Sequence, residues 1–177
     1  FLGGSGTGKS YTENKILEEY GNLFDKVISS TTRPSRQGEV NGVDYYFKKN
    51  KTHFFEEDYA EYDFFKDNYY GTPKKELFKN NKNIVLTMEP NGAKKILKYI
   101  QDNQIEIKPI IVYFKLNEND RFNNMKSRGD NQNQIDKRIN DDIDQRFLDN
   151  QLKADILITS VNKNNHKLIV EKVLNDF

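Results

Sequence analysis

The sequence opens with a glycine-rich stretch, GGSGTGKS, at residues 3–10, and this stretch matches the pattern G-x-x-x-x-G-K-[ST] at every fixed position. Glycines let a backbone turn its N–H groups toward phosphate oxygens, and the N-terminus of a following helix adds a positive dipole. Apolar Phe1 and Leu2 precede the stretch and a helical apolar spacing follows it. We therefore expect a strand, a phosphate-binding loop and a helix, in that order.

Each residue type in this loop has a chemical role toward a nucleoside triphosphate. Lys9 is expected to reach the β- and γ-phosphates of ATP, and the Ser10 hydroxyl is expected to coordinate Mg²⁺. The competing interpretation, a glycine-rich turn without a ligand, is disfavoured by the strand and helix on either side. The predicted ATP-binding residues are Gly3, Gly4, Ser5, Gly6, Thr7, Gly8, Lys9 and Ser10.

Composition restricts the remaining possibilities. The 177 residues suffice for one domain, and 28 Lys and Arg against 27 Asp and Glu leave a formal charge of +1. No overall field therefore favours a nucleic acid or a membrane as partner. The chain has no cysteine and two histidines, which excludes disulfides, thiol nucleophiles and a histidine metal cluster. We expect a cytoplasmic protein without a leader or a membrane span, beginning partway through its first strand.

Apolar runs and helical spacings alternate along the chain, which predicts an α/β fold with a parallel sheet covered on both faces. Residues 31–79 interrupt this alternation with an aromatic stretch, and Asn41-Gly42 is a hairpin signal there. The predicted strands are 25–30, 82–88, 107–116 and 154–159. The predicted helices are 10–20, 92–101, one ending near 127, one from 135 to about 151, and 166–175, with a loop at 128–134.

Two further motifs follow the phosphate loop. SSTTRPSRQGEVNGVDYYF (29–47) sets Arg33 and Arg36 ahead of a tyrosine pair, and NYYGTP (68–73) places another tyrosine pair beside a glycine and a threonine. The combination TTRPxRxGExNGxDYxF with NYYGT closely resembles guanylate kinase, and the resemblance extends in order over almost the whole chain. It implies an acceptor site for GMP. The GMP-binding residues that it implies are Ser29, Arg33, Arg36, Tyr45, Glu61, Tyr70, Thr72 and Glu89.

The chemistry of these residue types agrees with the implied roles. Guanidinium groups bind phosphate oxygens bidentately, and phenolic hydroxyls complete the cradle. Guanine presents N1–H and an amine side by side, which one carboxylate such as Glu61 can accept, whereas adenine has no such donor pair. Taken singly, the tyrosines fit ordinary strand aromatics and Glu61 fits a surface carboxylate. The arginines are harder to dismiss because only six of the 28 basic residues are arginine.

The segment RGDNQNQIDKR is flanked by Arg128 and Arg138, and the resemblance implies that it forms a lid over the transferring phosphoryl group. Positioning and charge neutralisation supply most of the rate of such a transfer. No general base is required, because a phosphate monoester has its second pKa at about 6. The implied catalytic residues are Lys9, Arg36, Arg128 and Arg138.

The sequence departs from the family pattern at several positions. Where the family usually has D-x-D, this chain has Thr87 and Glu89, and Asn124 stands where the family has its first lid arginine. Arg121 lies one helical turn before Asn124, and we expect it to take over that role. Thr159 replaces an asparagine on the adenine side, and the segment between Phe47 and Glu61 is short.

These inferences predict a single guanylate-kinase-like domain over 1–177 that transfers a phosphoryl group from MgATP to GMP, with dGMP also plausible. The predicted core is 1–29, 80–118 and 140–177, the GMP-binding insertion 30–79 and the lid 119–139. Two alternatives stay open: a non-catalytic guanylate-kinase-like interaction module, and a related kinase with a different phosphorylated acceptor. The sequence leaves the oligomeric state open.

Overall fold

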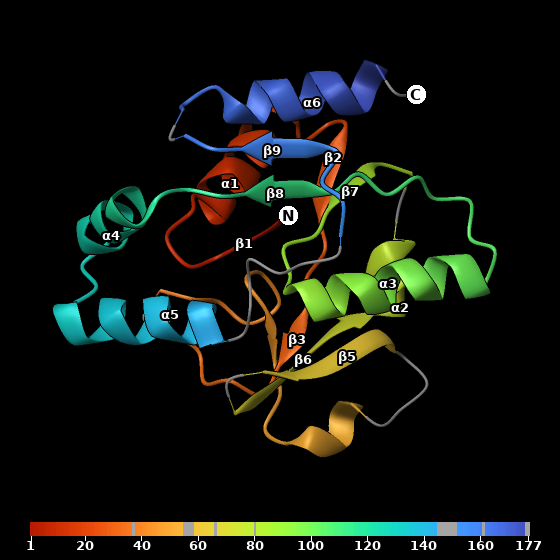
Figure 1. The fold of residues 1–177 in the computed structure, drawn as a ribbon. Helices are drawn as coiled ribbons and strands as arrows, with labels where there is room; N and C mark the ends of the chain where they lie inside the picture. The colour runs from red at the N-terminus through yellow and green to blue at the C-terminus, as the bar shows by residue number, and fades with distance from the viewer. Residues whose placement is uncertain are drawn as a thin grey trace. The chain divides into compact units, whose positions relative to one another are not determined.

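The structure is a computed structural model that describes residues 1–36, 38–54, 59–65, 67–79, 81–144, 152–160 and 162–175, without the side chains of 143 and 144. The chain divides into two compact units (Figure 1). The first unit comprises 1–21, 87–90 and 108–177, and the second comprises 22–86 and 91–107. The predicted helix to about 151 and the end of the chain reach beyond the described residues.

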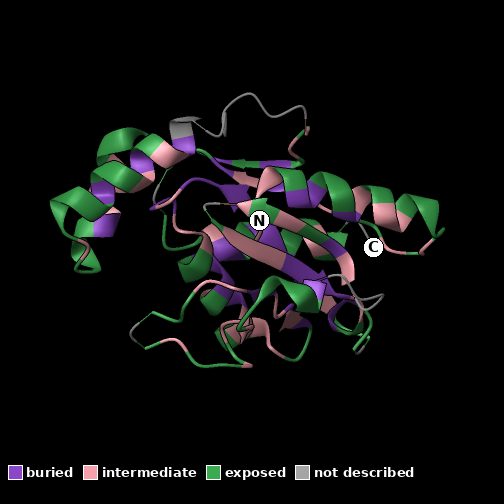
Figure 2. Cartoon of the chain, turned by 90° about the horizontal axis from the view of Figure 1, so that it is seen from below, coloured by how far each residue is buried: buried purple, intermediate pink, exposed green. Residues whose placement is uncertain are grey.

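The first unit is built on a parallel sheet in the order β1 (Leu2–Gly3), β8 (Val112–Phe114), β9 (Ile156–Ile158). Both edges of β8 are paired, and its Val112 and Phe114 are almost fully buried. The helices of this unit are α1 (Lys9–Tyr20), α4 (Glu118–Ser127), α5 (Gln132–Asp144) and α6 (Asn165–Asn175). Buried Ile16 on α1 and Ile169 and Val170 on α6 belong to its apolar interior, and exposed residues occupy the outer helix faces (Figure 2).

Local interactions determine where α4 and α5 begin. The Asn117 side chain caps α4 by accepting a hydrogen bond from the Asp120 N–H at 2.8 Å. Asn131 and Gln134 form a reciprocal capping box before α5, because each side-chain oxygen accepts from the other residue's backbone N–H. An apolar cluster then joins the two helices through Met125, Ile135 and Ile139.

The second unit contains two sheets. Parallel strands β2 (Phe24–Lys26) and β7 (Asn83–Val85) form one, and the other has the order β4 (Tyr46–Phe47), β3 (Ser30–Thr31), β6 (Asn68–Pro73), β5 (Tyr59–Phe65). Within the larger sheet β3 pairs with β4 in parallel, and β6 runs antiparallel to both β3 and β5. The helical elements are η1 (Lys51–Phe54), α2 (Lys74–Leu77) and α3 (Pro90–Asp102), the last belonging to this unit from Asn91 onward.

The α/β class and the parallel pairing are as the sequence predicts, but several local predictions were wrong. The predicted strands 82–88 and 154–159 are shortened to β7 and β9. The predicted strand 25–30 is divided between β2 and β3, and the ten-residue strand 107–116 shrinks to β8, because only three of its residues have paired neighbours. The Asn41-Gly42 hairpin is absent, since β3 and β4 are parallel and Asn41 forms only an isolated bridge to Tyr45. The loop 128–134 is shorter than predicted, because the capping box starts α5 at Gln132.

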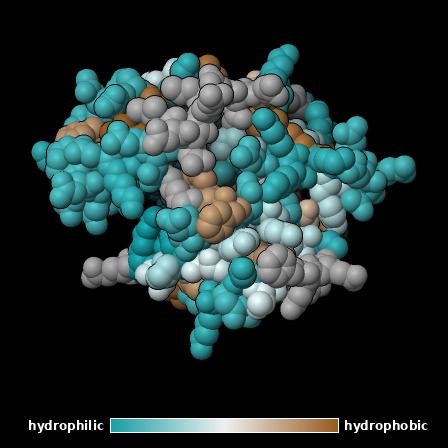
Figure 3. Space-filling view, turned by 60° about the horizontal axis from the view of Figure 1, so that its bottom comes forward, coloured by the Kyte–Doolittle hydropathy of each residue, from teal (hydrophilic) through white to brown (hydrophobic). Residues whose placement is uncertain are grey.

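Hydrophilic side chains predominate on the molecular face drawn in Figure 3, in keeping with the 31% of charged residues in the sequence. Among the helices in the described part of the chain, none combines the length and the apolar character needed to cross a lipid bilayer.

Candidate active site

The phosphate loop connects β1 to α1 and has the backbone conformation that its glycines permit. Gly3, Gly6 and Gly8 have φ angles of 143°, 75° and 90°, a region that residues with a side chain rarely adopt. The Thr7 hydroxyl donates to the Gly4 carbonyl at 2.8 Å and so closes the turn from within. Gly8 precedes the first residue of α1, so the loop leads directly into a helix N-terminus. This is the loop geometry that the motif predicts.

Lys9 folds back onto the loop. Its Nζ donates to the Gly3 carbonyl at 2.6 Å and to the Gly4 carbonyl at 2.8 Å. Burial lowers the pKa of the Lys9 ammonium from 10.5 to about 8, and the carboxylates of Glu89 and Asp142 partly offset this effect. The side chain therefore rests on neutral carbonyl dipoles, in a place where a phosphate would favour its charged form.

Side chains from α4 and α5 form hydrogen bonds with the backbone of the phosphate loop. The Ser5 N–H donates to Asp142 Oδ2 at 2.7 Å, and Arg121 Nε donates to the Ser5 carbonyl at 2.8 Å. Arg121 and Asp142 also form an ion pair with each other, in which the Asp142 side chain is 4% exposed. One turn along α4, Asn124 Nδ2 donates to the Gly6 carbonyl at 2.8 Å. Asn124, which stands where the family has its first lid arginine, and Arg121, which we expected to replace that arginine, thus both contact the phosphate loop.

The two predicted lid arginines lie in the first unit. Arg138 on α5 forms an ion pair with Asp130 at 3.4 Å, and its side chain is partly buried. Arg128 ends α4 and is exposed, and its charge contributes to lowering the pKa of Lys9. Arg128 therefore lies near enough to influence the phosphate loop electrostatically.

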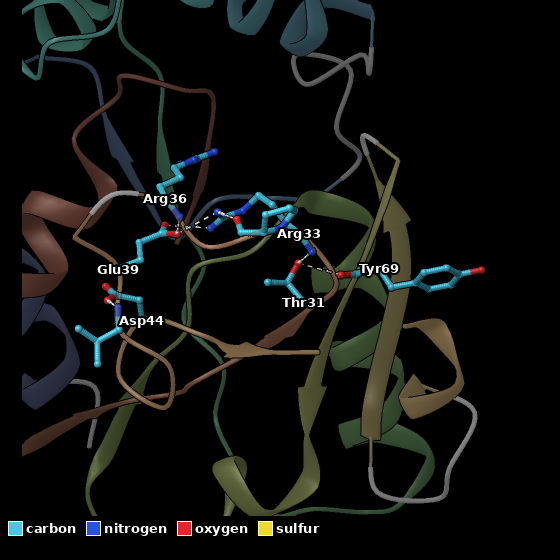
Figure 4. A network of polar contacts seen from close by, with 8 residues as sticks. Thr31, Arg33, Arg36, Glu39, Asp44 and Tyr69 are labelled. Atoms are coloured by element: carbon cyan, nitrogen blue, oxygen red, sulfur yellow. Dashed lines mark hydrogen bonds and ion pairs between the residues drawn. The ribbon is translucent and has the colours of Figure 1, made fainter. Parts of the chain in front are cut away.

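Two of the residues predicted to bind the acceptor, Arg33 and Arg36, contact Glu39 in the second unit. Arg33 binds the Glu39 carboxylate bidentately, with two N–H···O distances of 2.9 Å (Figure 4). The same carboxylate accepts the Arg36 backbone N–H at 2.6 Å, while the Arg36 side chain extends away from it. Thr31 anchors the start of this segment, because its Oγ1 accepts the Arg33 N–H and donates to the Tyr69 carbonyl. The guanidinium of Arg33 is thereby held in one orientation.

Aromatic rings surround this guanidinium. Its Cζ lies 5.3 Å from the ring centroid of Tyr45 and 5.7 Å from that of Phe47. Tyr70 meets Tyr45 edge to face at 6.3 Å between ring centroids. The structure therefore brings together Arg33, Tyr45 and Tyr70, three of the residues predicted to hold a phosphate.

Glu61 and Thr72 face each other across the antiparallel pair β5 and β6. The Thr72 hydroxyl donates to Glu61 Oε1 at 2.8 Å, and Glu61 is 8% exposed. Burial raises the pKa of the Glu61 carboxyl from 4.5 to about 7, although the Thr72 hydrogen bond and the Lys95 charge oppose the increase. Ser29, the third predicted guanine reader, is half-buried, and its carbonyl accepts the Tyr46 N–H at 2.9 Å.

Glu89 lies in the first unit, near enough to Lys9 to raise the pKa of that ammonium. It thus belongs to a different unit from the other predicted GMP-binding residues, and its role toward GMP stays a prediction. Two residues earlier, the Thr87 hydroxyl oxygen is buried without a hydrogen-bond partner among the described residues. A buried hydroxyl of this kind fits a site that receives a polar ligand.

The residues present also fit a magnesium nucleotide. Ser10 is exposed in the first turn of α1 and directly follows Lys9 in the sequence. The described residues contain no group of three or more His, Cys, Asp or Glu side chains able to hold a metal ion by themselves. A magnesium ion here would therefore take oxygen ligands from Ser10, nucleotide phosphates and water, which is how Mg²⁺ is commonly bound.

Sequence reasoning missed two residues of the site. Glu39 was part of the quoted motif but received no role, although it orients Arg33. Asp142 lies in a run of charged residues on α5, where nothing in the sequence distinguishes the buried carboxylate from its neighbours. A search for glutamates in a fixed interval from the arginine pair could have found Glu39.

Comparison with known proteins identifies the family and the fold. The family model described as guanylate kinase matches residues 1–173. Among solved structures, the chain is similar to the crystal structure of guanylate kinase from Anaplasma phagocytophilum, with a TM-score of 0.64 and 21% sequence identity over 99% of this chain and 84% of that one. That likeness shows the fold, and the family match shows the membership. The protein therefore belongs to the guanylate kinase family, and this membership supports a nucleotide-binding kinase.

Proposed function

We propose that the protein is a guanylate kinase in activity as well as in family: it transfers the γ-phosphoryl group of ATP to GMP, and to dGMP at a related rate. The observation that carries this proposal is the buried Glu61 carboxyl, held by Thr72 in the second unit. An ionised carboxylate accepts both N1–H and the exocyclic amine of guanine. Adenine offers no matching donors, so AMP would leave a buried carboxylate unpaired.

The donor side of the proposed reaction uses the phosphate loop. The loop N–H groups other than that of Ser5, which donates to Asp142, would bind the β- and γ-phosphates together with the start of α1. Lys9 would exchange the carbonyls of Gly3 and Gly4 for phosphate oxygens. Magnesium, when bound through Ser10, supplies charge neutralisation to the transferring group.

The acceptor side would hold the GMP phosphate with Arg33, Arg36, Tyr45 and Tyr70. Arg33 is already oriented by Glu39 and the surrounding rings, which supports a binding role. The acceptor phosphate needs no general base, because its second pKa is about 6. Arg36, Arg128 and Arg138 would neutralise charge on the transferring group, with 119–139 acting as the lid.

Several finer predictions belong to the same proposal. Ser29 and Glu89 would complete the guanine site, and the insertion 30–79 would form the acceptor part of the molecule. The substrates are small molecules, no nucleic acid or membrane takes part, and the reaction is a cytoplasmic one. The intact Lys9 and Ser10 favour the kinase over a non-catalytic interaction module.

One assay tests the proposal. ADP formation is followed with ATP and, separately, GMP, dGMP, AMP, UMP and CMP. We expect turnover with GMP and dGMP, and rates for the other acceptors lower by about a hundredfold or more. Equal rates across the bases would refute guanine recognition, and the absence of ADP with every acceptor would instead favour the interaction module.

A further inference from the structure

An ion pair that the loop motif does not include hydrogen-bonds to the backbone of the phosphate loop. Arg121 on α4 and Asp142 on α5 meet at Ser5, where Arg121 donates to the carbonyl and Asp142 accepts from the N–H. Both polar groups of one loop residue are thus satisfied by the two members of a single ion pair. A loop residue gripped at both groups cannot rotate either adjacent peptide without breaking a charge-assisted hydrogen bond.

The loop sequence itself accommodates this pair. Gly4 occupies a position that the phosphate-loop pattern leaves open to any residue. A Cβ on Gly4 would lie 2.8 Å from Asp142 Oδ2 and 2.9 Å from Arg121 Nη2. No positive φ requires glycine there, and a Cβ would have to displace the ends of both charged side chains.

The electrostatics point the same way. Asp142 raises the pKa of Lys9 and Arg121 lowers it, so the two charges act on the lysine in opposite directions. As an ion pair the two side chains have almost no net charge, and they hydrogen-bond both to each other and to Ser5. Either charge alone, largely buried, would change the field at the site where phosphates are proposed to bind.

We propose that Arg121 and Asp142 are positioning residues for the donor nucleotide: together they hold the Ser5 segment in the conformation that receives the donor phosphates. This inference rests on the proposed function in that the loop binds ATP. It replaces the expectation that Arg121 acts on the transferring phosphoryl group itself. Asn124 supports the next part of the loop through the Gly6 carbonyl.

The test measures binding of MgADP by calorimetry in the absence of any acceptor, together with the KM values for ATP and GMP. Arg121→Met leaves a buried carboxylate beside the phosphates, and we expect the ADP Kd and the KM for ATP to rise about tenfold or more. Asp142→Asn still accepts the Ser5 N–H and should weaken ADP binding about threefold. In both variants the KM for GMP should stay within about twofold of the wild-type value.

Two combined variants separate positioning from general damage. Arg121→Met with Asp142→Asn removes both charges, so its ADP affinity should be no lower than that of Arg121→Met alone. Gly4→Ala should weaken ADP binding by displacing the pair, and it should add nothing once Arg121→Met is present. Lys98→Ala, which breaks an exposed ion pair with Asp102 on α3, is the matched control and should leave binding unchanged.

Several results would overturn the proposal. ADP binding within about twofold of wild type in both single variants would remove the positioning role. A KM for GMP that rises as much as that for ATP would indicate general damage. A lower kcat for Arg121→Met with unchanged ADP binding would make Arg121 a catalytic residue instead. A wild-type protein that binds MgADP but does not phosphorylate GMP would refute the proposed function, while ADP binding would still decide the role of the pair.

Discussion

Each unit has at its site an ionisable side chain whose pKa is shifted by burial, and the two pKa values are shifted in opposite directions. In the first unit burial lowers the pKa of Lys9 to about 8, and in the second unit it raises that of Glu61 to about 7. Both shifts favour the neutral form because a charge loses hydration inside the protein. Both groups need their charge for the proposed reaction. We therefore expect each group to become fully ionised only when its own substrate binds.

The two groups differ in their present partners. Lys9 donates to two neutral backbone carbonyls and has carboxylates, Glu89 and Asp142, at longer range. Glu61 accepts hydrogen bonds from the hydroxyl and the backbone of Thr72, and its pKa is affected by the charges of Lys95 and Asp63. The Lys9 ammonium thus has charges of both signs around it, whereas the hydrogen bonds described for Glu61 come from the neutral groups of a single residue, Thr72.

The largest effect is expected from removing the donor-side charge. Lys9→Met keeps the length of the side chain but cannot stabilise the phosphates, so kcat should fall on the order of a thousandfold. Steady-state kinetics with ATP and GMP measures this loss. Lys15→Met, which removes a partly exposed lysine from the same helix, is the control and should keep the wild-type rate. A Lys9→Met enzyme within tenfold of wild type would contradict the donor role.

The acceptor carboxylate should give the next largest effect. Glu61→Gln loses two charge-assisted hydrogen bonds to guanine and places an amide donor against guanine donors, so the KM for GMP should rise about a hundredfold. The preference for GMP over AMP should fall by a similar factor. Glu106→Gln, at an exposed position, is the control. An unchanged preference would show that the base is read elsewhere.

A smaller effect is expected at Glu39, which orients Arg33. Glu39→Gln breaks the bidentate pair, so Arg33 loses its fixed orientation and the KM for GMP should rise about tenfold with little change in the KM for ATP. Inhibition by inorganic phosphate competing with GMP provides a second measurement. Tighter GMP binding in this variant would mean that Glu39 competes with the substrate phosphate.

Structural features that depend on residues close together in the sequence were predicted most accurately. The phosphate loop and α1 were predicted within a residue, because glycines, a lysine and a helical spacing lie side by side in the sequence. Glu61 and Thr72 were predicted through the resemblance, and their contact depends on the register of β5 against β6. Strand lengths were overestimated where apolar residues such as those before Val112 extend beyond the paired segment.

The support of the phosphate loop could not be predicted in the same way. Arg121 and Asp142 are 21 residues apart, and each is more than a hundred residues from Ser5. In the DDID run of α5, Asp141 is half-buried and Asp142 fully buried, a difference set by packing rather than by residue type. The capping box at Asn131 and Gln134, in contrast, was readable as a local pattern and would have corrected the start of α5.

The opposed pKa shifts lead to a last prediction. Binding of ADP should make the protein take up a proton at Lys9, and binding of GMP should make it release one at Glu61. In the free protein, Glu61 makes the free energy of unfolding fall between pH 4.5 and 7, because the folded state holds the proton longer. Lys9 makes it rise between pH 8 and 10.5, because there the unfolded state binds more protons. Substrate binding should reverse both shifts, since phosphates favour the Lys9 ammonium and guanine favours the Glu61 carboxylate.

Calorimetry in buffers of different ionisation enthalpy measures these protons. We expect ADP binding at pH 8.5 to take up most of a proton and GMP binding at pH 6.5 to release most of one, since each pH lies about half a unit from the pKa on the side of the neutral form. Lys9→Met should abolish the uptake, and Glu61→Gln should abolish the share of the release that does not come from the GMP phosphate. Uptake at both sites, or release at both sites, would contradict the comparison. It would mean that burial does not lower the pKa of Lys9 and raise that of Glu61.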